Sequence, residues 1–461
     1  MNNYLSVPGL VLGAALLSAC ASPVMPPKSD LPADSFVNAQ TAVPASVTDN
    51  WWKLYQDPLL DRLVERALGE NLDLQIALAR IDAGRALRNI AGASGSPQID
   101  LGASVARQRI SADQAGFTDS LITEPTSLGL SAAWEIDLFG RIREGVRAAD
   151  ADLNATEEEA RGVRVALITE VVQAYAEARG LEERLAIVKQ SAASQAETLQ
   201  LTEQLYAAGD SPEADLLRAR SQSDSTAAQV PALQLNWQRS LHRLSVLLAQ
   251  PTETLYQQFK ERPANVSTVS LLDASTPADL LRRRPDIRVA EARLIAAYAR
   301  VGVAKADLLP RLSLSAALGS LIDGVSAANL ASSTFWLAGL NASVPVFDGG
   351  RRRNVVDLRD AEARQALLSY RRTVLTAVSE VESALAAAQR NAERQTFLAS
   401  AASQASSAAE QIQRAWQAGE TPFLDVLQAQ RVQLAAQNAL SQVKTAQWQN
   451  QAALVNALGG R

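Results

Sequence analysis

The feature that most constrains the fold of this chain is an internal repeat. Residues 206–212 (YAAGDSP) return as residues 416–422 (WQAGETP), and residues 138–141 (LFGR) are matched by residues 348–351 (DGGR). The spacing is about 210 residues in both pairs, which is long enough for each copy to be a structural unit of its own. The sequence therefore predicts two similar halves.

Each half reads as a strand, a loop, a second strand, a very long helix, a tight turn and another long helix. We expect the first half at residues 57–265 and the second at residues 266–461. Alternating apolar residues predict the strands, which fall at about 98–109, 127–138, 311–321 and 335–347. Segments of this length suit strands that cross a membrane. The same alternation is also typical of a soluble hairpin packed on helices.

A very long helix is predicted in each half before the tight turn. No proline interrupts residues 140–209, and apolar or small residues recur there with spacings of four and three over residues 167–206, as they do over residues 377–416. Such a heptad pattern is typical of helices that pack along their whole length. About seventy helical residues extend on the order of 100 Å, roughly three times the hydrocarbon thickness of a bilayer. The expected fold class is therefore mainly α, with a small membrane β-barrel part.

The two tight turns share one pattern of glycine, hydroxyl residue and proline. The six residues are Gly209, Ser211 and Pro212 in the first half and Gly419, Thr421 and Pro422 in the second. Glycine suits the left-handed conformation that ends a helix. Ser or Thr can cap the following helix, and proline fits its first helical position. We expect the chain to reverse direction at both turns.

The N-terminal segment predicts export and attachment to membrane lipid. Residues 1–19 carry no charged side chain and contain a short apolar run, which is typical of a signal peptide. Residues 17–20 (LSAC) resemble a bacterial lipobox, in which Cys20 is lipidated and begins an extended segment, residues 20–56. Ala21 is not the Asp that is associated with retention of lipoproteins in the inner membrane, which favours the outer membrane. An uncleaved anchor with a chance cysteine is the alternative.

Composition excludes several functions. The 44 Lys and Arg residues against 49 Asp and Glu give a net charge of −5, which offers no reason to expect a nucleic-acid partner. One Cys and one His exclude a zinc site or an iron–sulfur cluster built from several such residues. The lone His242 lies in an amphipathic helical run, and no phosphate-cradling, dinucleotide or nucleophile-elbow motif occurs. We expect neither an enzyme nor a cofactor.

The number of predicted strands requires several chains if these strands cross a membrane. After the signal peptide, no segment has the roughly 18–20 uninterrupted apolar residues of a membrane helix. Four strands cannot close a barrel, and an open sheet edge in lipid leaves backbone groups unpaired. Two chains would supply eight strands and three chains twelve. Strand counting leaves both open, although only the wider barrel encloses a water-filled conduit, so that transport favours three chains.

Several short motifs resemble one family. They are residues 51–52 (WW) with 57–58 (DP), residues 283–288 (RRPDIR), and residues 303–306 (VAKA) before 309–310 (LP). Together they make the chain similar to TolC-like outer-membrane efflux proteins, in particular the NodT-like lipoprotein subgroup. The resemblance implies a homotrimer with a twelve-strand barrel in the outer membrane, continued by a tunnel of helices in the periplasm.

The resemblance also implies partners and a function. A periplasmic adaptor protein and an inner-membrane transporter, commonly of the resistance-nodulation-division type, would deliver small toxic compounds to this passive exit duct. The tunnel end that faces the adaptor holds the helix turns, which assigns the six turn residues to that contact. The same architecture also serves type I protein secretion, and a coiled-coil lipoprotein with a purely structural role is a further alternative.

The resemblance places a gate just beyond the second turn. Acidic residues there form a ring in the family; Asp425 matches this position and Asp215 is its counterpart in the first half. Three symmetry-related carboxylates in a narrow pore repel one another and attract cations. Each Asp also lies in the first turn of a predicted helix, where a negative charge stabilises the helix end. Trp416 matches an aromatic residue that takes part in locking the closed tip, although packing between helices also explains it, and Gln428 stands where some members have a second acidic ring.

Overall fold

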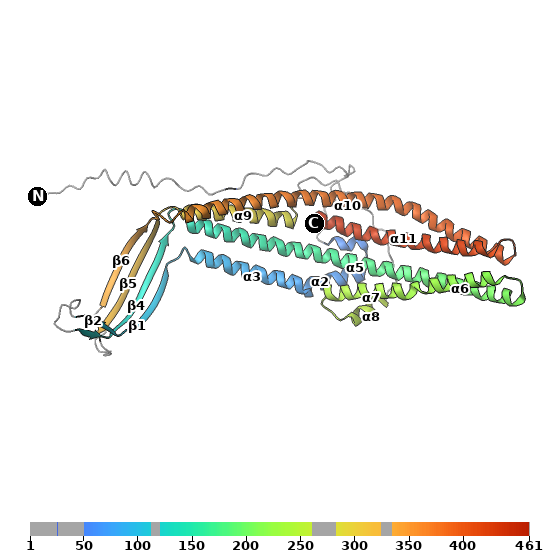
Figure 1. Ribbon diagram of the computed structural model, residues 1–461, viewed down its shortest axis with the longest axis horizontal. Coiled ribbons are helices and arrows are strands. Elements are labelled where there is room, and N and C mark those ends of the chain that lie inside the picture. The colour runs from blue at the N-terminus through green and yellow to red at the C-terminus, as the bar shows by residue number, and fades with distance from the viewer. Residues whose placement is uncertain (1–24, 26–49, 112–119, 261–282, 324–333, 461) are drawn as a thin grey trace. The chain divides into compact units, whose positions relative to one another are not determined.

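The structure, a computed structural model, describes residues 25, 50–111, 120–260, 283–323 and 334–460 (Figure 1). The predicted signal peptide, Cys20 and the junction of the two halves at residues 265 and 266 lie outside these ranges. The predicted domain limits therefore stay predictions.

The chain forms two compact units, and each combines segments from both halves of the repeat. The sheet unit contains Arg80–Glu157 and Val289–Arg371. The hairpin unit contains Glu158–Arg288, Arg372–Arg461 and the described residues of Asp30–Ala79.

The sheet unit holds a four-stranded antiparallel sheet in the order β1-β4-β5-β6 (Figure 1). The strands are β1 (Gln98–Val105), β4 (Pro125–Ile136), β5 (Arg311–Asp323) and β6 (Thr334–Ser343). Two short strands, β2 (Gln108–Ile110) and β3 (Leu121–Thr123), pair with each other in a separate ladder. Strands therefore occur at all four predicted positions.

Two strand ends differ from the prediction by four residues, and a proline explains each of these differences. The first strand ends at Val105 instead of near residue 109. Ala106 still donates to the carbonyl of Pro125 at 3.0 Å, but Pro125 has no N–H to return and the ladder stops. The last strand ends at Ser343 instead of residue 347, because Pro345 follows two residues later and cannot donate to a ladder.

Helices make up most of the described chain. They are η1 (Trp51–Tyr55), α2 (Pro58–Glu70), α3 (Leu72–Ala93), α5 (Arg141–Ala208), α6 (Glu213–Ala227), α7 (Gln229–Leu247), α8 (Thr252–Lys260), α9 (Pro285–Ala306), α10 (Arg351–Gln417) and α11 (Phe423–Ala457). The two long helices α5 and α10 have 68 and 67 residues, which confirms the predicted length. Among the described helices, none is both long and apolar enough to cross a membrane.

The helix that follows each tight turn is where the two halves of the repeat differ. In the second half α11 runs unbroken for 35 residues. In the first half the same stretch is divided at Ala228 into α6 and α7. Pro231 accounts for the break, since proline cannot donate to the preceding turn and its ring crowds the backbone there. The residue that corresponds to it in α11 is Ser441, which permits a continuous helix.

The predicted heptad seams are buried or half-buried along almost their whole length, which confirms the packing of the long helices. The fully buried members are Leu167, Val171, Ala174, Ala178, Leu181, Val188, Gln195 and Thr202 in α5 and Ala377, Val381, Ala388, Ala402 and Ala409 in α10. Tyr206, the last predicted member in α5, is exposed instead. It lies in the last turn of α5, where that helix runs into the first tight turn.

A close approach of α5 to α11 depends on a glycine in the hairpin unit. A Cβ atom added to Gly180 would lie 2.0 Å from the Thr445 hydroxyl oxygen and 3.0 Å from the Thr445 Cβ atom. Nearby, Ser441 and Lys444 of α11 donate to the Glu183 carboxylate at 2.8 and 3.2 Å. Gly180 therefore lets the two helices approach closely enough for these bonds to form.

We expect Gly180→Ala to lower the stability of the protein by about 1–3 kcal/mol, because the added methyl group overpacks this contact. Gly145→Ala is the matched control in the same helix, since a Cβ at Gly145 meets nothing within 4 Å. Alanine there gains about 0.5–1 kcal/mol of helix propensity. Thermal unfolding followed by circular dichroism measures both variants, and equal unfolding temperatures would contradict the proposed close contact.

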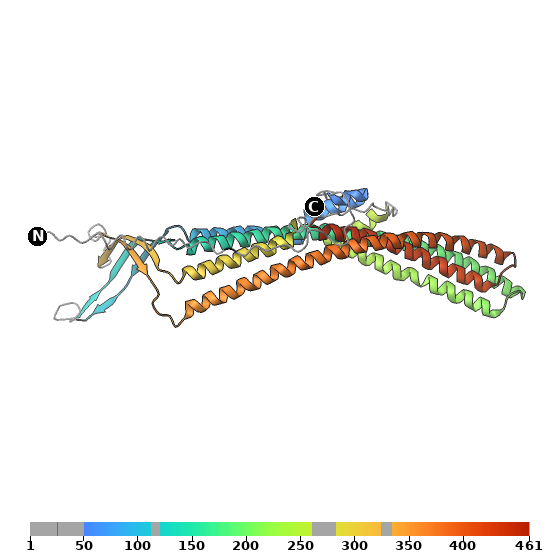
Figure 2. The same cartoon turned by 90° about the horizontal axis from the view of Figure 1, so that it is seen from above.

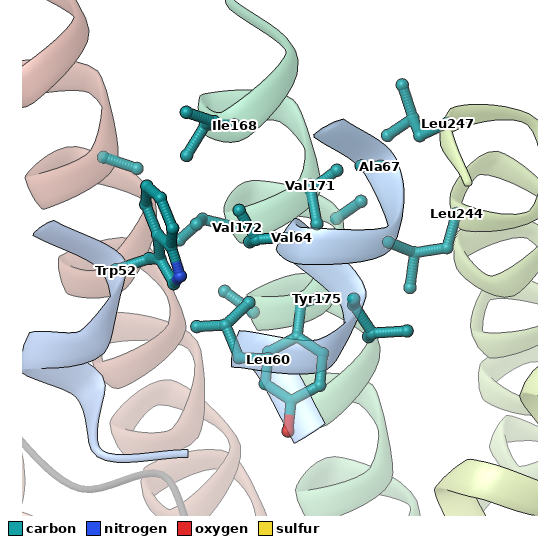
Figure 3. Close-up of a cluster of buried hydrophobic side chains, with 14 of the residues drawn as sticks. Trp52, Leu60, Val64, Ala67, Ile168, Val171, Val172, Tyr175, Leu244 and Leu247 are labelled. Atoms are coloured by element: carbon teal, nitrogen blue, oxygen red, sulfur yellow. The ribbon is translucent and has the colours of Figure 1, made fainter. Parts of the chain in front are cut away.

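The main core of the hairpin unit is formed by η1 and α2, which begin at the WW and DP motifs, together with α5 and α7 (Figure 3). Trp52 and Leu60 pack against Val171 and Val172 of α5 in a fully buried cluster. Asp57 caps α2 by accepting from the amide of Leu59 at 2.9 Å. The motifs that carried the family resemblance thus fold into a packed core.

Two polar side chains complete this core. The Tyr175 hydroxyl donates to the Asp57 carboxylate, and burial raises the pKa of the Tyr175 phenol, which therefore stays protonated. Asn71 is buried between α2 and α3; its amide nitrogen donates to the Leu247 carbonyl and its oxygen accepts from the Leu74 amide, each at 2.9 Å. Buried polar groups with partners of this kind fix how the helices pack.

The RRPDIR motif forms a clamp on the end of α11. Arg284 is buried, and its guanidinium donates to the Asp286 carboxylate at 2.7 and 2.9 Å, to Glu380 at 2.6 Å and to the Ala457 carbonyl at 2.7 Å. Burial lowers the pKa of the Arg284 guanidinium, but the hydrogen bonds that it donates to the two carboxylates, together with their negative charges, raise this pKa by more. The charge of Arg284 also stabilises the negative C-terminal end of α11.

Candidate membrane surface and helix tips

The strand register gives the sheet one apolar face. Rows of directly paired residues cross the sheet, and the central row joins Leu101, Leu130, Leu318 and Trp336. A neighbouring row is Ile99, Ala132, Ala316 and Ala338, and another joins Trp134, Leu314 and Leu340. Large side chains on this face are exposed in the single chain, with exposed fractions of 47% for Leu130 and 80% for Trp336. An apolar surface this continuous is typical of contact with another apolar phase.

The opposite face of the sheet is mainly small and polar. One row joins Gly102, Gly129, Gly319 and Phe335, and a second joins Asp100, Ser131, Ala317 and Leu337. Ser104 and Ser127 hydrogen-bond through their hydroxyl groups at 2.8 Å. A Cβ atom at Gly319 would lie 2.9 Å from the Phe335 ring, so that glycine leaves room for the aromatic side chain. The sheet therefore separates an apolar from a polar side.

Both outer edges of this sheet are open within the described part of the chain. β1 pairs only with β4, and β6 pairs only with β5. Each free edge carries a row of backbone N–H and C=O groups that need partners when they are removed from water.

The two helix turns have the predicted reversal in matching geometry. Gly209 and Gly419 adopt φ angles of +81° and +76°. The amide of Gly209 donates to the Tyr206 carbonyl at 3.0 Å and that of Gly419 to the Trp416 carbonyl at 2.9 Å. In each turn, the amide of the residue after the glycine donates to the carbonyl of the residue that precedes the glycine's acceptor. This second bond completes a Schellman motif.

The predicted helix caps are wrong by one residue. Pro212 and Pro422 occupy the N-cap positions of α6 and α11, with extended backbone conformations, instead of the first helical position. Neither N-cap makes a side-chain hydrogen bond to the helix. The hydroxyl group of Thr421 donates instead to the carboxylate of Asp425 at 2.9 Å. Because the extended N-cap conformation suits the fixed φ of proline, the helix begins one residue later than expected.

The two candidate gate carboxylates have different surroundings. Both lie in the first turn of a helix and are half-buried. Asp215 accepts from the Arg218 guanidinium at 2.9 Å, which offsets its charge. Asp425 has only the Thr421 hydroxyl, and no cation pairs with it within the described residues. The position that corresponds to Arg218 in the second half is the exposed Gln428.

Trp416 packs at the second tip. Its ring lies 5.3 Å from the Phe423 ring, and both contact a small cluster that contains Ala219 and Leu427. This cluster joins α6 and α11, the helices that follow the two turns. The structure therefore supports the packing interpretation of Trp416.

Sequence reasoning missed two features of these sites. Arg218 lies three residues after Asp215, a spacing that brings two side chains together on a helix, and this signal was available in the sequence. The clamp by Arg284 was not predictable, since its partners Glu380 and Ala457 are distant in the chain. Cys20 lies outside the described residues, and its lipidation stays a prediction.

The chain belongs to the outer membrane efflux protein family. The sequence model of this family matches residues 63–250 and 276–460. It is thus an outer-membrane protein of an efflux class. This confirms the family resemblance found in the sequence and the expected fold of long helices with a small sheet.

Two relatives and one solved structure illustrate the similarity. Nodulation protein T of Rhizobium leguminosarum bv. viciae is 33% identical over 93% of this chain and 89% of its own length. The pyoverdine export outer membrane protein OpmQ of Pseudomonas aeruginosa is 33% identical over 98% of this chain and 96% of its own. The structure of the outer-membrane channel OprN is similar with a TM-score of 0.87 and 36% identity, covering 95% of this chain and 99% of that one.

Proposed function

We propose that three copies of this chain form a passive exit duct for small molecules. Their twelve strands close a barrel in the outer membrane, and their long helices continue it as a tunnel in the periplasm. A periplasmic adaptor and an inner-membrane transporter, of the resistance-nodulation-division type, deliver the compounds at the helix tips around Gly209 and Gly419. The lipid attached at Cys20 adds a second anchor to the outer membrane.

The observation that carries this proposal is the two-sided sheet with two open edges. Its apolar side suits lipid, and its polar side suits a water-filled interior. Among the described strands, the free edges of β1 and β6 have no further partner; further chains can supply one, whereas lipid offers no hydrogen bonds. A sheet in a soluble structural lipoprotein would have its apolar side covered by helices.

Efflux of small molecules is favoured over protein secretion. Relatives of the chain include OpmQ, named for pyoverdine export, and a solvent efflux pump outer membrane protein of Pseudomonas putida that is 31% identical over 97% of this chain. Planar bilayer recording with the purified protein tests the duct directly. We expect discrete conductance steps; a preparation that inserts into the bilayer without conducting would contradict the proposal.

Asp425→Asn is expected to reduce the preference of this channel for cations over anions roughly threefold or more, since it removes one carboxylate per chain from the constriction. Asp215→Asn is the matched control, because Arg218 already offsets the charge of Asp215. Its effect on the reversal potential under a salt gradient should be clearly smaller. If the two variants shift this potential equally, Asp425 has no special role at the gate.

Cys20→Ser is expected to abolish incorporation of radiolabelled palmitate in bacterial cells, because the lipobox needs the thiol for acylation. Conductance should persist, since the barrel strands insert through their own apolar face. Labelled Cys20→Ser protein would show that the lipid is attached elsewhere.

A further inference from the structure

The RRPDIR motif also lines a cavity that the duct does not require. This cavity of about 350 Å³ lies in the hairpin unit beside the beginning of α9, the middle of α5 and the residues that follow α11. Figures 1 and 2 both show the C-terminal end of the chain beside the beginning of α9. Four arginine residues line the cavity, Arg161, Arg164, Arg283 and Arg288, together with one acidic residue, Glu158.

The charge in this cavity is unbalanced. Glu158 accepts from Arg161 at 2.6 Å and from Arg288 at 3.1 Å, so that one carboxylate serves two guanidinium groups. Arg164 and Arg283 form no ion pair or hydrogen bond with any described residue. The carboxylates of Asp286 and Glu380 pair with the neighbouring Arg284, and neither forms an ion pair with Arg283 among the described residues. Four cations and one anion therefore face a single hollow, which favours a bound anion.

One wall of the cavity is built from a glycine turn. Gly459 and Gly460 have φ angles of +90° and +78°. A Cβ atom at Gly460 would lie 2.5 Å from the Val165 side chain, and one at Gly459 would lie 3.2 Å from the Arg284 backbone. Their amides bond to carbonyls of α11 at 3.0 and 2.9 Å. The glycines bring this wall close to Val165 and Arg284. Their amides are already bonded, so that the arginines are left as donors for a ligand.

We propose that this cavity, which we call the arginine pocket, binds a small polyanion that carries two or more phosphate or carboxylate groups. Guanidinium groups bind such oxyanions through paired hydrogen bonds, and four of them match a ligand with more than one anionic group. The volume lies in the range of small-molecule sites. The proposed exit duct does not depend on this pocket, and the two can be tested separately.

Isothermal titration of the detergent-purified full chain tests the arginine pocket, with pyrophosphate and citrate as probes at constant ionic strength. We expect saturable binding that the double variant Arg164→Gln/Arg283→Gln weakens at least about tenfold. Arg239→Gln is the control, since Arg239 is an exposed arginine of the same unit outside the cavity. Preference for pyrophosphate would identify a phosphorylated ligand, and preference for citrate a carboxylate.

Three results would overturn the proposal. They are absence of binding by either probe, unchanged affinity in the double variant, and an equal loss of affinity in Arg239→Gln, which would indicate general charge attraction. If the double variant binds no probe because its subunits separate, the less disruptive single variants Arg164→Lys and Arg283→Gln are titrated instead. Assembled single variants with wild-type affinity would also contradict the pocket. Conductance in planar bilayers reports on the duct independently.

Discussion

Arg284→Met should lower the free energy of unfolding by about 3 kcal/mol, an effect large enough to shift the thermal transition by several degrees. Methionine keeps much of the side-chain volume but removes the charge and every hydrogen bond that the guanidinium makes. The buried carbonyl of Ala457 then loses its donor. The carboxylates of Asp286 and Glu380 are about half exposed, so water replaces part of the hydrogen bonding that they lose with the guanidinium. The expected destabilisation is therefore near the lower end of the range for buried ion pairs.

Thermal unfolding of the purified protein measures the effect, and the chain offers two controls. Arg283→Met alters the adjacent arginine, which is exposed and forms no ion pair or hydrogen bond with a described residue. This variant should unfold at the wild-type temperature. Arg284→Lys keeps the charge without the planar fork and should fall between the wild type and the methionine variant. If Arg284→Met unfolds like the wild type, the clamp on α11 does not contribute to stability.

The sequence predicted those parts of the fold that depend on local patterns. The length of α5 follows from the absence of proline and from its heptad spacing, and the turn at Gly209 follows from the left-handed conformation that glycine adopts without strain. The ends of β1 and β6 were missed for a local reason as well, since Pro125 and Pro345 interrupt ladders that the apolar alternation alone would extend.

Contacts between distant segments were beyond the sequence. The alternation in each strand predicted an apolar face, but the alignment of Leu101 with Leu130 and of Leu318 with Trp336 follows only from the strand register. Register depends on how four separate segments pair, which the pattern of a single strand does not contain. The RRPDIR motif both forms a clamp, at Arg284, and lines a cavity. These two roles also depend on contacts with distant segments, which the sequence pattern does not contain.

Both the sequence pattern and the contacts in the structure are needed to distinguish the two candidate gate residues. Their equivalence in the repeat suggested Asp215 as a second gate carboxylate. The repeat is imperfect one turn further on, where Arg218 corresponds to Gln428. Of the two candidate gate residues, Asp215 therefore has a cationic partner and Asp425 has none among the described residues. The divergence between the two halves therefore predicts that Asp425, rather than Asp215, acts at the proposed gate.

Leu130→Arg is expected to prevent most of the protein from assembling in the outer membrane. Leu130 lies in the central row of the apolar face, between Leu101 and Leu318. A guanidinium on the lipid face of a barrel costs about 2–4 kcal/mol near the middle of the bilayer. In the proposed trimer this cost applies to each of the three chains, so the total is comparable with the whole stability of an ordinary domain.

Ser131→Arg is the matched control for this substitution. It places the same side chain one residue further along β4, on the polar face beside Asp100 and Ala317. This variant should assemble, since a charge in a water-filled interior costs little, and should change ion selectivity instead. Fractionation of cell membranes and electrophoresis of the unheated oligomer measure assembly. Equal assembly of both variants would mean that the apolar face does not contact lipid. The opposite pattern, in which only Ser131→Arg fails, would mean that the two faces of the sheet are assigned the wrong way round.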